Sequence, residues 1–359
     1  MDNVPMPESS TPFPAVSPSL VPASVVVGFL GAGKTTLINH LLTSVHDQKL
    51  AVIVNDFSEI NIDARLVRHT SDRLIEMSNG CICCTLREDL VEELEELSTI
   101  GGLDGIVIES TGIGEPLPIA QAFYMGSLPD RLRLQEIITV VDAAAFWNDY
   151  ERSDWIEDAE GNAVNAPLAP LLIDQLEFTN VIVLNKTDMV SDGDLLRLEG
   201  YVRSLNPSAR LLRATHANVD VSLLFKTGLY LYEDGEAAED WDLTWEIDAA
   251  GEADEYGFNT FTYTSTAPFR YAQFMQLFED WPDEIMRAKG FVSFVDHPQV
   301  IISVVRDTLD LQILGDIADT GEEPALATSE IDESVEIVFI GRAMPVQAIL
   351  ERLEACHPS

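Results

Sequence analysis

The feature that most constrains the fold is a phosphate-binding motif near the start of the chain. Residues 28–35 read Gly-Phe-Leu-Gly-Ala-Gly-Lys-Thr, which fits the pattern G-x-x-x-x-G-K-S/T. The apolar run 25–27 precedes the motif and the helical pattern 36–42 follows it. This is the strand–loop–helix setting that the motif requires. A glycine-rich turn without a ligand is the alternative, and the setting argues against it.

The residue types of this motif suit a nucleotide with a bound Mg²⁺. Glycines such as Gly28 let backbone N–H groups close around phosphate oxygens, and the following helix N-terminus favours negative charge. Lys34 is expected to reach the β- and γ-phosphates, and we assign it a catalytic role. The Thr35 hydroxyl is expected to bind Mg²⁺. The motif therefore predicts a nucleoside triphosphate as ligand.

A second motif predicts which base is bound. Asn185-Lys186-Thr187-Asp188 follows the apolar run 181–184. The Asp188 carboxylate can accept two hydrogen bonds from the guanine N1–H and exocyclic amine, which adenine cannot offer. Alone, this pattern is a common accident or a polar turn. Downstream of a phosphate-binding loop it indicates guanine, so GTP is the expected nucleotide.

Two more strand ends carry acids. Glu109 ends the apolar run 105–108, where it can hold Mg²⁺ through water, and Gly112 would let backbone N–H approach the γ-phosphate. Asp56 and Glu59 follow an earlier strand, again at the carboxyl edge where ligands bind in parallel sheets. Either could orient the attacking water or complete a metal shell, and either could simply cap a turn.

Three cysteines lie within four residues at Cys81, Cys83 and Cys84. Three soft ligands suit Zn²⁺ or another thiophilic ion, although a tetrahedral site needs a fourth ligand that the sequence does not identify. Thr85 begins a capping box that opens a helix, and a helix N-terminus favours thiolates nearby. Small buried side chains and a redox sensor are the alternatives. Cys356, alone near the end, is interpreted as structural.

The order of apolar runs predicts two folded parts. Short runs alternate with helical patterns up to about residue 224, which indicates a parallel sheet with helices on both faces. Strands are expected at 25–27, 51–54, 106–108, 137–141, 181–184 and 211–212. After residue 258 the pattern changes to a small α+β domain, a sheet with helices on one face. There, strands are expected at 258–263, 290–295, 300–305 and 335–340, and helices at 270–281 and 346–356.

The expected organisation is a disordered tail at 1–22, a P-loop GTPase domain at 23–228, an acidic linker at 229–257 and an α+β domain at 258–359. The tail is rich in proline and has neither the basic start nor the apolar run of a signal peptide. No stretch of 18 apolar residues occurs, and clustered thiols suit a reducing compartment. We therefore expect a cytoplasmic protein.

The charge of the chain excludes two classes of partner. There are 61 acidic and 21 basic residues, so the formal net charge is −40. The acids are spread along the whole chain, which indicates an acidic surface similar to that of salt-adapted archaeal proteins. A field of this sign repels nucleic acid and anionic membranes, so direct binding to either is not expected.

Taken together, these motifs resemble the CobW-type P-loop GTPases, relatives of the hydrogenase- and urease-maturation GTPases. The resemblance rests on the P-loop, the C-x-C-C segment at 79–90 and E-S-T-G-x-x-E-P at 109–116, in this order, and it extends into the C-terminal half. It implies GTP hydrolysis coupled to holding a metal, zinc or cobalt, and delivering it to a client protein. It places the metal at Cys81, Cys83 and Cys84, and the nucleotide at Gly28, Gly31, Ala32, Gly33, Lys34, Thr35, Thr36, Gly112, Asn185, Lys186 and Asp188.

The sequence departs from the family pattern in two places. The usual N-E-F-G-E reads Asn-Asp-Phe-Ser-Glu at 55–59, and the histidine-rich stretch between domains has no counterpart. Three rival functions stay open. They are a metal-binding module in which GTP only stabilises the fold, cobalt handling for cobalamin synthesis, and a small-molecule kinase, against which Asn185 and Asp188 argue. The sequence does not predict the oligomeric state or the client, and hydrolysis is expected to be slow without a partner.

Overall fold

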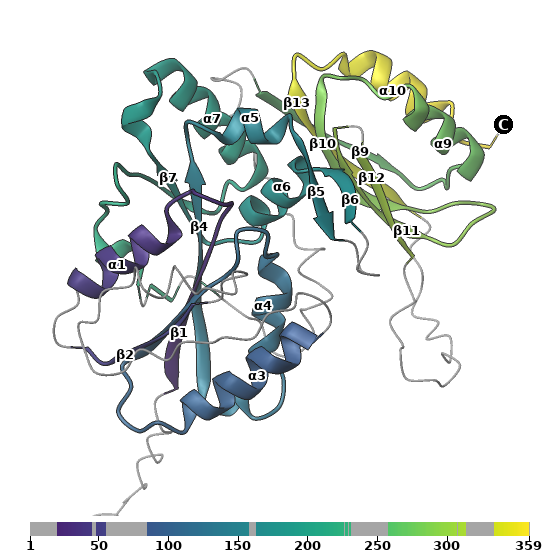
Figure 1. Ribbon diagram of the computed structural model, residues 1–359. Coiled ribbons are helices and arrows are strands. Elements are labelled where there is room, and N and C mark those ends of the chain that lie inside the picture. Colours follow the sequence, from purple (N-terminus) through teal and green to yellow (C-terminus); the bar gives the residue numbers. More distant parts are fainter. Residues whose placement is uncertain are drawn as a thin grey trace, which may run out of the picture.

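The computed structural model describes residues 20–44, 48–54, 85–157, 163–225, 227, 228, 230, 258–306, 308–313 and 334–358. Within these residues the chain forms a parallel sheet, an antiparallel sheet and a two-stranded hairpin (Figure 1). None of the helices in these ranges is long and apolar enough to cross a membrane.

The first sheet holds six of the described strands in the order β2-β3-β1-β4-β7-β8, and every neighbouring pair is parallel. The carboxyl ends of these strands therefore meet at one edge. The order changes direction at β1, with β3 on one side and β4 on the other, which is where ligands bind in open parallel sheets. The bounds are β1 Val21–Val27, β2 Leu50–Val54, β3 Gly105–Glu109, β4 Leu132–Asp142, β7 Val181–Asn185 and β8 Arg210–Arg213.

Helices cover both faces of this sheet because successive strand residues point to opposite sides. Val26 and Val183 pack in one core with residues of α1, whereas Val25 packs with α3 and Ile182 with α6 and α7. The expectation of a parallel sheet buried on both faces is confirmed. The helices are α1 Lys34–Ser44, α3 Thr85–Ser98, α4 Pro116–Ala122, α5 Phe146–Tyr150, α6 Ala169–Glu177 and α7 Asp192–Leu205.

Several short elements interrupt this pattern. Strands β5 (Ser153–Glu157) and β6 (Ala163–Pro167) form an antiparallel hairpin between α5 and α6, which the sequence analysis did not anticipate. Single 3₁₀ turns occupy Leu128–Asp130, Thr187–Met189 and Val221–Leu223. The second of these carries the predicted guanine-binding motif.

The second sheet has the order β12-β11-β10-β13-β9 among the described strands and is antiparallel throughout. Helices α9 and α10 cover one face, where Phe274 and Leu353 pack against Ile337 and Phe339 (Figure 1). The expected small α+β domain is confirmed, with one additional strand, β12. The bounds are β9 Phe258–Ser265, α9 Tyr271–Glu279, β10 Ile285–Val292, β11 Val300–Val305, β12 Thr308–Ile313, β13 Val335–Arg342 and α10 Val346–Glu354.

The other face of the second sheet packs on the first part of the chain. Phe258, Val305 and Ile340 belong to the same buried core as Ile173 of α6 and Tyr201 of α7. Ile340 therefore faces away from α9 and α10, as the alternation along β13 requires. Helix α6 thus lies between the two sheets and touches both.

The predicted tail, acidic linker and domain boundaries fall largely outside the described residues and stay predictions. One difference can be seen. Strand β1 begins at Val21, inside the segment assigned to the tail, and the Val21 amide donates to the Arg131 carbonyl at 2.9 Å. Pro22, the last residue of the predicted tail, lies within this strand.

Candidate nucleotide site

The phosphate-binding motif forms the loop between β1 and α1, and its backbone conformation depends on glycine. Gly28, Gly31 and Gly33 have φ values of 138°, 75° and 109°, a region that side chains with Cβ atoms rarely adopt. A Cβ on Gly28 would lie 2.2 Å from the Val140 carbonyl oxygen, and one on Gly33 would lie 2.5 Å from Asn185 Nδ2. The loop therefore packs closely against β4 and β7, and it keeps the shape of a phosphate cradle.

Lys34 lies at the first position of α1 and is 8% exposed. Its ammonium group donates to the carbonyls of Gly28 at 2.8 Å and Phe29 at 3.2 Å, so the side chain folds back over the loop. The positive charge of a lysine and the positive end of the helix dipole repel each other, and a bound anion stabilises both. The arrangement suits a phosphate placed between Lys34 and the first turn of the helix, where Thr36 is exposed.

Thr35 and Glu109 are brought together by strand pairing. Glu109 ends β3 beside Val26 of β1, and its carboxylate Oε1 accepts a hydrogen bond from Thr35 Oγ1 at 2.8 Å. The Glu109 side chain is 3% exposed. A hydroxyl and a carboxylate beside a phosphate cradle are hard oxygen donors of the kind that Mg²⁺ prefers. These two residues therefore fit the predicted Mg²⁺ site.

The loop 110–114 continues from Glu109 and touches the phosphate-binding loop a second time. A Cβ on Gly112 would lie 2.4 Å from Leu30 Cδ2 and 2.9 Å from the Leu30 amide nitrogen, so only glycine allows this approach. The turn closes with a hydrogen bond from the Gly114 amide to the Thr111 carbonyl at 3.0 Å. The predicted closeness of Gly112 to the phosphates is consistent with this contact.

Asn185 connects the phosphate side of the site to the base side. Its Nδ2 donates to the Ala32 carbonyl at 2.9 Å, and its Oδ1 accepts from the Ala217 amide at 2.8 Å. The side chain is 2% exposed. One residue thus fixes the phosphate-binding loop, the end of β7 and the segment after β8 at the same edge of the sheet.

The other residues of the base motif are more open. Lys186 adopts a left-handed conformation with φ of 61°, and its Nζ donates to Asp142 Oδ2 at 2.6 Å. Asp188 is exposed in the 3₁₀ turn that follows. An exposed carboxylate beside this anchored framework is available to a base.

Two parts of the site were missed by sequence reasoning. Asp142 ends β4 and pairs with Lys186, which the strand end could have suggested. Residues 214–217 follow β8, and Thr187 donates through its amide to the Ala214 carbonyl at 3.1 Å. His216 and Ala217 have φ of 51° and 55°, conformations that these residue types do not reveal from sequence. The carboxyl end of β8 at the shared edge was the available signal.

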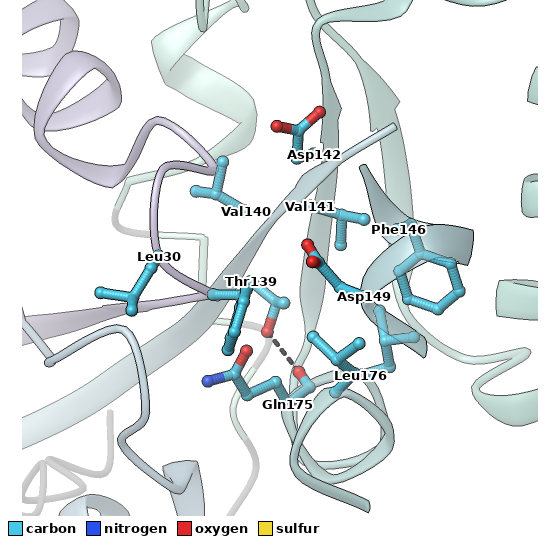
Figure 2. Close-up of a pocket in the computed structure, with 11 residues that line it drawn as sticks. Leu30, Thr139, Val140, Val141, Asp142, Phe146, Asp149, Gln175 and Leu176 are labelled. Carbon is cyan, nitrogen blue, oxygen red and sulfur yellow. Dashed lines mark hydrogen bonds between the residues drawn. The ribbon is translucent and has the colours of Figure 1, made fainter. Parts of the chain in front are cut away.

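A pocket adjoins the phosphate-binding loop on the side of Phe29 and Leu30. It lies between the end of β4 and helices α5 and α6, and Figure 2 shows Asp149 and Gln175 on its walls. The Thr139 hydroxyl donates to the Gln175 carbonyl across its floor (Figure 2). The pocket separates the phosphate loop from α6, the helix that also touches the second sheet.

The predicted transition-metal ligands cannot be placed. Cys81, Cys83, Cys84, Asp56 and Glu59 all lie outside the described residues. In the part of the chain that the structure describes, no group of three or more His, Cys, Asp or Glu side chains could hold a metal ion. Cys356 is buried in the C-terminal core, and burial raises the pKa of its thiol to about 11, which suits the predicted structural role.

Comparison with known proteins gives the following matches. Residues 22–213 match the family described as CobW/HypB/UreG, nucleotide-binding domain, and residues 258–357 match the Cobalamin synthesis protein cobW C-terminal domain. A "Zinc-regulated GTPase metalloprotein activator 1" of Dictyostelium discoideum is 37% identical over 306 residues, covering 78% of this chain and 64% of the relative. A "Zinc chaperone YjiA" of Escherichia coli K12 is 32% identical over 221 residues, covering 60% and 64%.

The chain thus spans less than two thirds of the length of these relatives. Among solved structures, the Zn(II)-bound YjiA GTPase from E. coli matches 94% of this chain and 99% of that chain. The identity is 22% and the TM-score 0.43.

Proposed function

Because this chain belongs to the CobW/HypB/UreG family, we propose that it binds and hydrolyses GTP and couples hydrolysis to the handling of zinc for a client protein. The observation that carries the nucleotide part is the buried Asn185 bridge. It holds the phosphate-binding loop, the base motif and residues 214–217 at one edge of the sheet. A site that fixes phosphate and base elements together suits a guanine nucleotide better than a free phosphate.

The predicted site residues divide the work of hydrolysis. Lys34 moves its ammonium from the Gly28 and Phe29 carbonyls to the phosphates and neutralises charge on the transferring group. Thr35 and Glu109 would hold Mg²⁺, which would supply further charge neutralisation when bound. Gly112 lets the backbone of its loop approach the γ-phosphate. Asp56 is proposed to orient the attacking water, and Glu59 to complete a metal shell.

The zinc part of the proposal rests on the cysteines and on the relatives. Cys81, Cys83 and Cys84 supply three thiolates, and two relatives carry names that associate them with zinc. The three cysteines lie in the chain between β2 and β3, two neighbouring strands of the nucleotide sheet. A reducing compartment, the cytoplasm, keeps such thiols available for metal. Cobalt is the alternative cargo.

The nucleotide part is tested with a Lys34→Ala variant. We expect GTP turnover to fall by at least about 100-fold, because a contact made mainly in the transition state is lost. Circular dichroism should show that the variant keeps its fold. Lys49→Ala, which removes an exposed lysine just before β2, at the amino end of the parallel sheet, is the control. Near-normal turnover by a folded Lys34→Ala variant would move the active site elsewhere.

The zinc part is tested by competition against a zinc chelator, with GDP and with a non-hydrolysable GTP analogue. A coupling of typical size predicts a 5- to 150-fold difference in zinc affinity between the two states. Replacing Cys81, Cys83 and Cys84 by serine should abolish zinc binding, whereas Cys356→Ser should not. Equal affinities in both nucleotide states would leave a GTPase with a structural metal.

A further inference from the structure

Helix α6 (Ala169–Glu177) has an unusual set of buried residues for a helix on a sheet. Beside the apolar Leu172, Ile173 and Leu176, the polar Gln175 and Glu177 are 2% and 8% exposed. Residues two apart on a helix point about 200° apart. Gln175 and Glu177 therefore reach opposite sides, and burial on both sides requires neighbours on both.

Gln175 reaches the nucleotide side. Its Nε2 donates to the Gly114 carbonyl at 3.1 Å, and the backbone carbonyl of Gln175 accepts from the Thr139 hydroxyl of β4 (Figure 2). Gly114 closes the turn that begins at Thr111 and contains Gly112, which is packed against Leu30. The Gln175 amide thus holds the far end of the loop that faces the phosphates.

Glu177 reaches the second sheet. Its two carboxylate oxygens accept from Arg287 Nε and Nη2, each at 2.8 Å, and Arg287 lies in β10. The side chains of the pair are 3% and 2% exposed. Arg287 Nη1 also donates to Ser303 Oγ of β11 at 2.6 Å, so the guanidinium joins three elements. This bidentate pair is the strong form of a charged contact, and its breakage would leave a buried charge.

We propose that α6 couples the loop 110–114 to the second sheet. Gln175 positions the loop, and the Glu177–Arg287 pair transmits the conformation of the loop to the second sheet. The proposal rests on the GTPase function proposed above. A change of the loop between GTP and GDP moves the Gly114 carbonyl. Gln175 and the rigid helix carry that movement to Arg287, because packed interfaces shift as units rather than deform. By linkage, whatever binds the second sheet alters the preference for GTP over GDP by the same factor.

Gln175→Met is the test on the nucleotide side, because methionine keeps the length of the side chain and removes the donor. Loss of this hydrogen bond should lower kcat about 3- to 10-fold with KM within about 2-fold, the signature of a group that positions the loop during reaction. Gln175→Asn, which restores an amide on a shorter chain, should recover part of kcat. Gln347→Met, on exposed α10, is the control. A kcat equal to wild type in a folded Gln175→Met variant would overturn the positioning role.

The interface is tested with the double variant Glu177→Leu and Arg287→Met, since apolar replacement of both partners keeps the core packed and removes the charge pair. The readout is hydrogen exchange of the β10 and β13 amides with GDP and with a non-hydrolysable GTP analogue. Wild type should show a rate difference of about 5-fold or more between the two states. The difference should vanish in Gln175→Met and in the double variant. Arg352→Met with Asp280→Leu, which removes a partly exposed pair between α10 and the residue that follows α9, is the control and should retain it.

The outcomes separate this inference from the proposed function. A wild-type protein that hydrolyses GTP but shows no nucleotide-dependent exchange in β10 or β13 would overturn the coupling and keep the GTPase. Full retention of the difference in the double variant and in Gln175→Met would also overturn it. A wild-type protein without GTP binding would overturn the function on which the coupling rests.

Discussion

Asn185 shows how much of the site depends on one buried side chain. Its side-chain oxygen accepts a hydrogen bond from the Ala217 amide at 2.8 Å, and its side-chain nitrogen donates one to the Ala32 carbonyl at 2.9 Å. Replacement by an apolar residue would leave the Ala32 carbonyl and the Ala217 amide without this partner in a buried setting, which costs about 1–3 kcal/mol. Because both contacts are to backbone groups of the protein, Asn185 preorganises this edge of the sheet.

Asp188 is the residue for which base choice can be tested directly. We expect Asp188→Asn to weaken GTP binding by about 5- to 150-fold, because the new amide nitrogen then faces the exocyclic amine of guanine, a donor against a donor. The same change should improve binding of xanthosine triphosphate, which carries a carbonyl in place of the exocyclic amine of guanine. Calorimetry with both nucleotides measures the switch. Asp192→Asn, in the first turn of α7, is the matched control, and equal binding of ATP and GTP by wild type would remove the basis for the prediction.

Asp174 ties the stability of the interface to pH. The pKa of its carboxyl is raised from 3.8 to about 7, first by burial and then by the neighbouring Glu177, while Arg287 acts to lower it. Of the more distant charges, Glu115 raises this pKa and Lys289 lowers it. The folded state keeps the Asp174 proton up to a higher pH than the unfolded state does. Protonation of Asp174 therefore stabilises the folded state fully below about pH 4. This stabilisation is lost as the pH rises through about 7.

Asp174→Asn should therefore gain stability relative to wild type as the pH rises. We expect the difference in unfolding free energy to grow by on the order of 2–4 kcal/mol between pH 4 and pH 8. Urea titrations at several pH values measure it. Asp280→Asn, which replaces a 95% exposed side chain, controls for the substitution itself. A stability difference that does not change with pH would contradict the assignment.

At the scale of elements, the phosphate-binding loop is the most constrained connection that the structure describes. We expect Gly28→Ala to abolish nucleotide binding and to destabilise the fold by more than about 3 kcal/mol. The new Cβ would meet the Val140 carbonyl at 2.2 Å, and the backbone has φ of 138°. Gly101→Ala is the matched control, since nothing lies within 4 Å of its Cβ position. Thermal unfolding and nucleotide binding of the two variants check this, and a Gly28→Ala protein as stable as Gly101→Ala would show that the loop can rearrange.

Local patterns predicted the elements whose residues are apolar and missed those with buried polar residues. The runs 181–184 and 300–305 became β7 and β11 because both faces of those segments are apolar. Strand β10 was expected to start at residue 290 and starts at Ile285, since the charge of Arg287 suggests an exposed position. Its partner Glu177 lies 110 residues away, and no local pattern reveals such a pair.

Strands β4 and β12 give two further reasons for the misses. Strand β4 starts at Leu132, whereas the sequence predicted a start at residue 137. The charge of Glu136 suggested an exposed position, but this side chain is fully buried and accepts hydrogen bonds from Ser24 and Thr227. Strand β12 alternates apolar and polar residues over Thr308–Ile313, a usable signal that was overlooked at the edge of the sheet. Buried polar side chains thus limited the prediction of β4 and β10, but not that of β12.

The residues of the site also divide into those that motifs predicted and those that only the fold revealed. Lys34, Thr35, Glu109, Gly112 and Asn185 were predicted from motifs and lie together at the carboxyl edge of the sheet. Residues 214–217 and Gln175 were not predicted, because their roles depend on backbone conformation and on contacts across the chain. The cysteine, Asp56 and Glu59 assignments stay predictions. A motif predicts the atoms that meet a ligand, and the residues that hold those atoms in place become visible only in the fold.

At the scale of the whole molecule, the net charge of −40 acts on every contact described above. Self-repulsion of this size opposes the compact state, and salt reduces it by shortening the Debye length from about 10 Å at 0.1 M to about 3 Å at 1 M. The two sheets are held together partly by a buried ion pair, which salt screens little, and by an apolar core. The repulsion between exposed acids is therefore the term that salt changes most.

We therefore expect the melting temperature to rise with KCl from 0.1 to 1 M by several degrees, because each kcal/mol gained raises it by about 1–2 °C in a chain of 359 residues. Calorimetry over a KCl series measures it, and a sucrose series of equal osmolality distinguishes screening from solute exclusion. Sodium chloride should act nearly as well as KCl if screening is the cause. The hydrolysis assays should therefore be run at high salt, since nucleotide binding at low salt would report partial unfolding as well as affinity. A melting temperature that is constant or falls over this range would show that the acidic surface does not limit stability, and the comparison of variants could then be made in dilute buffer.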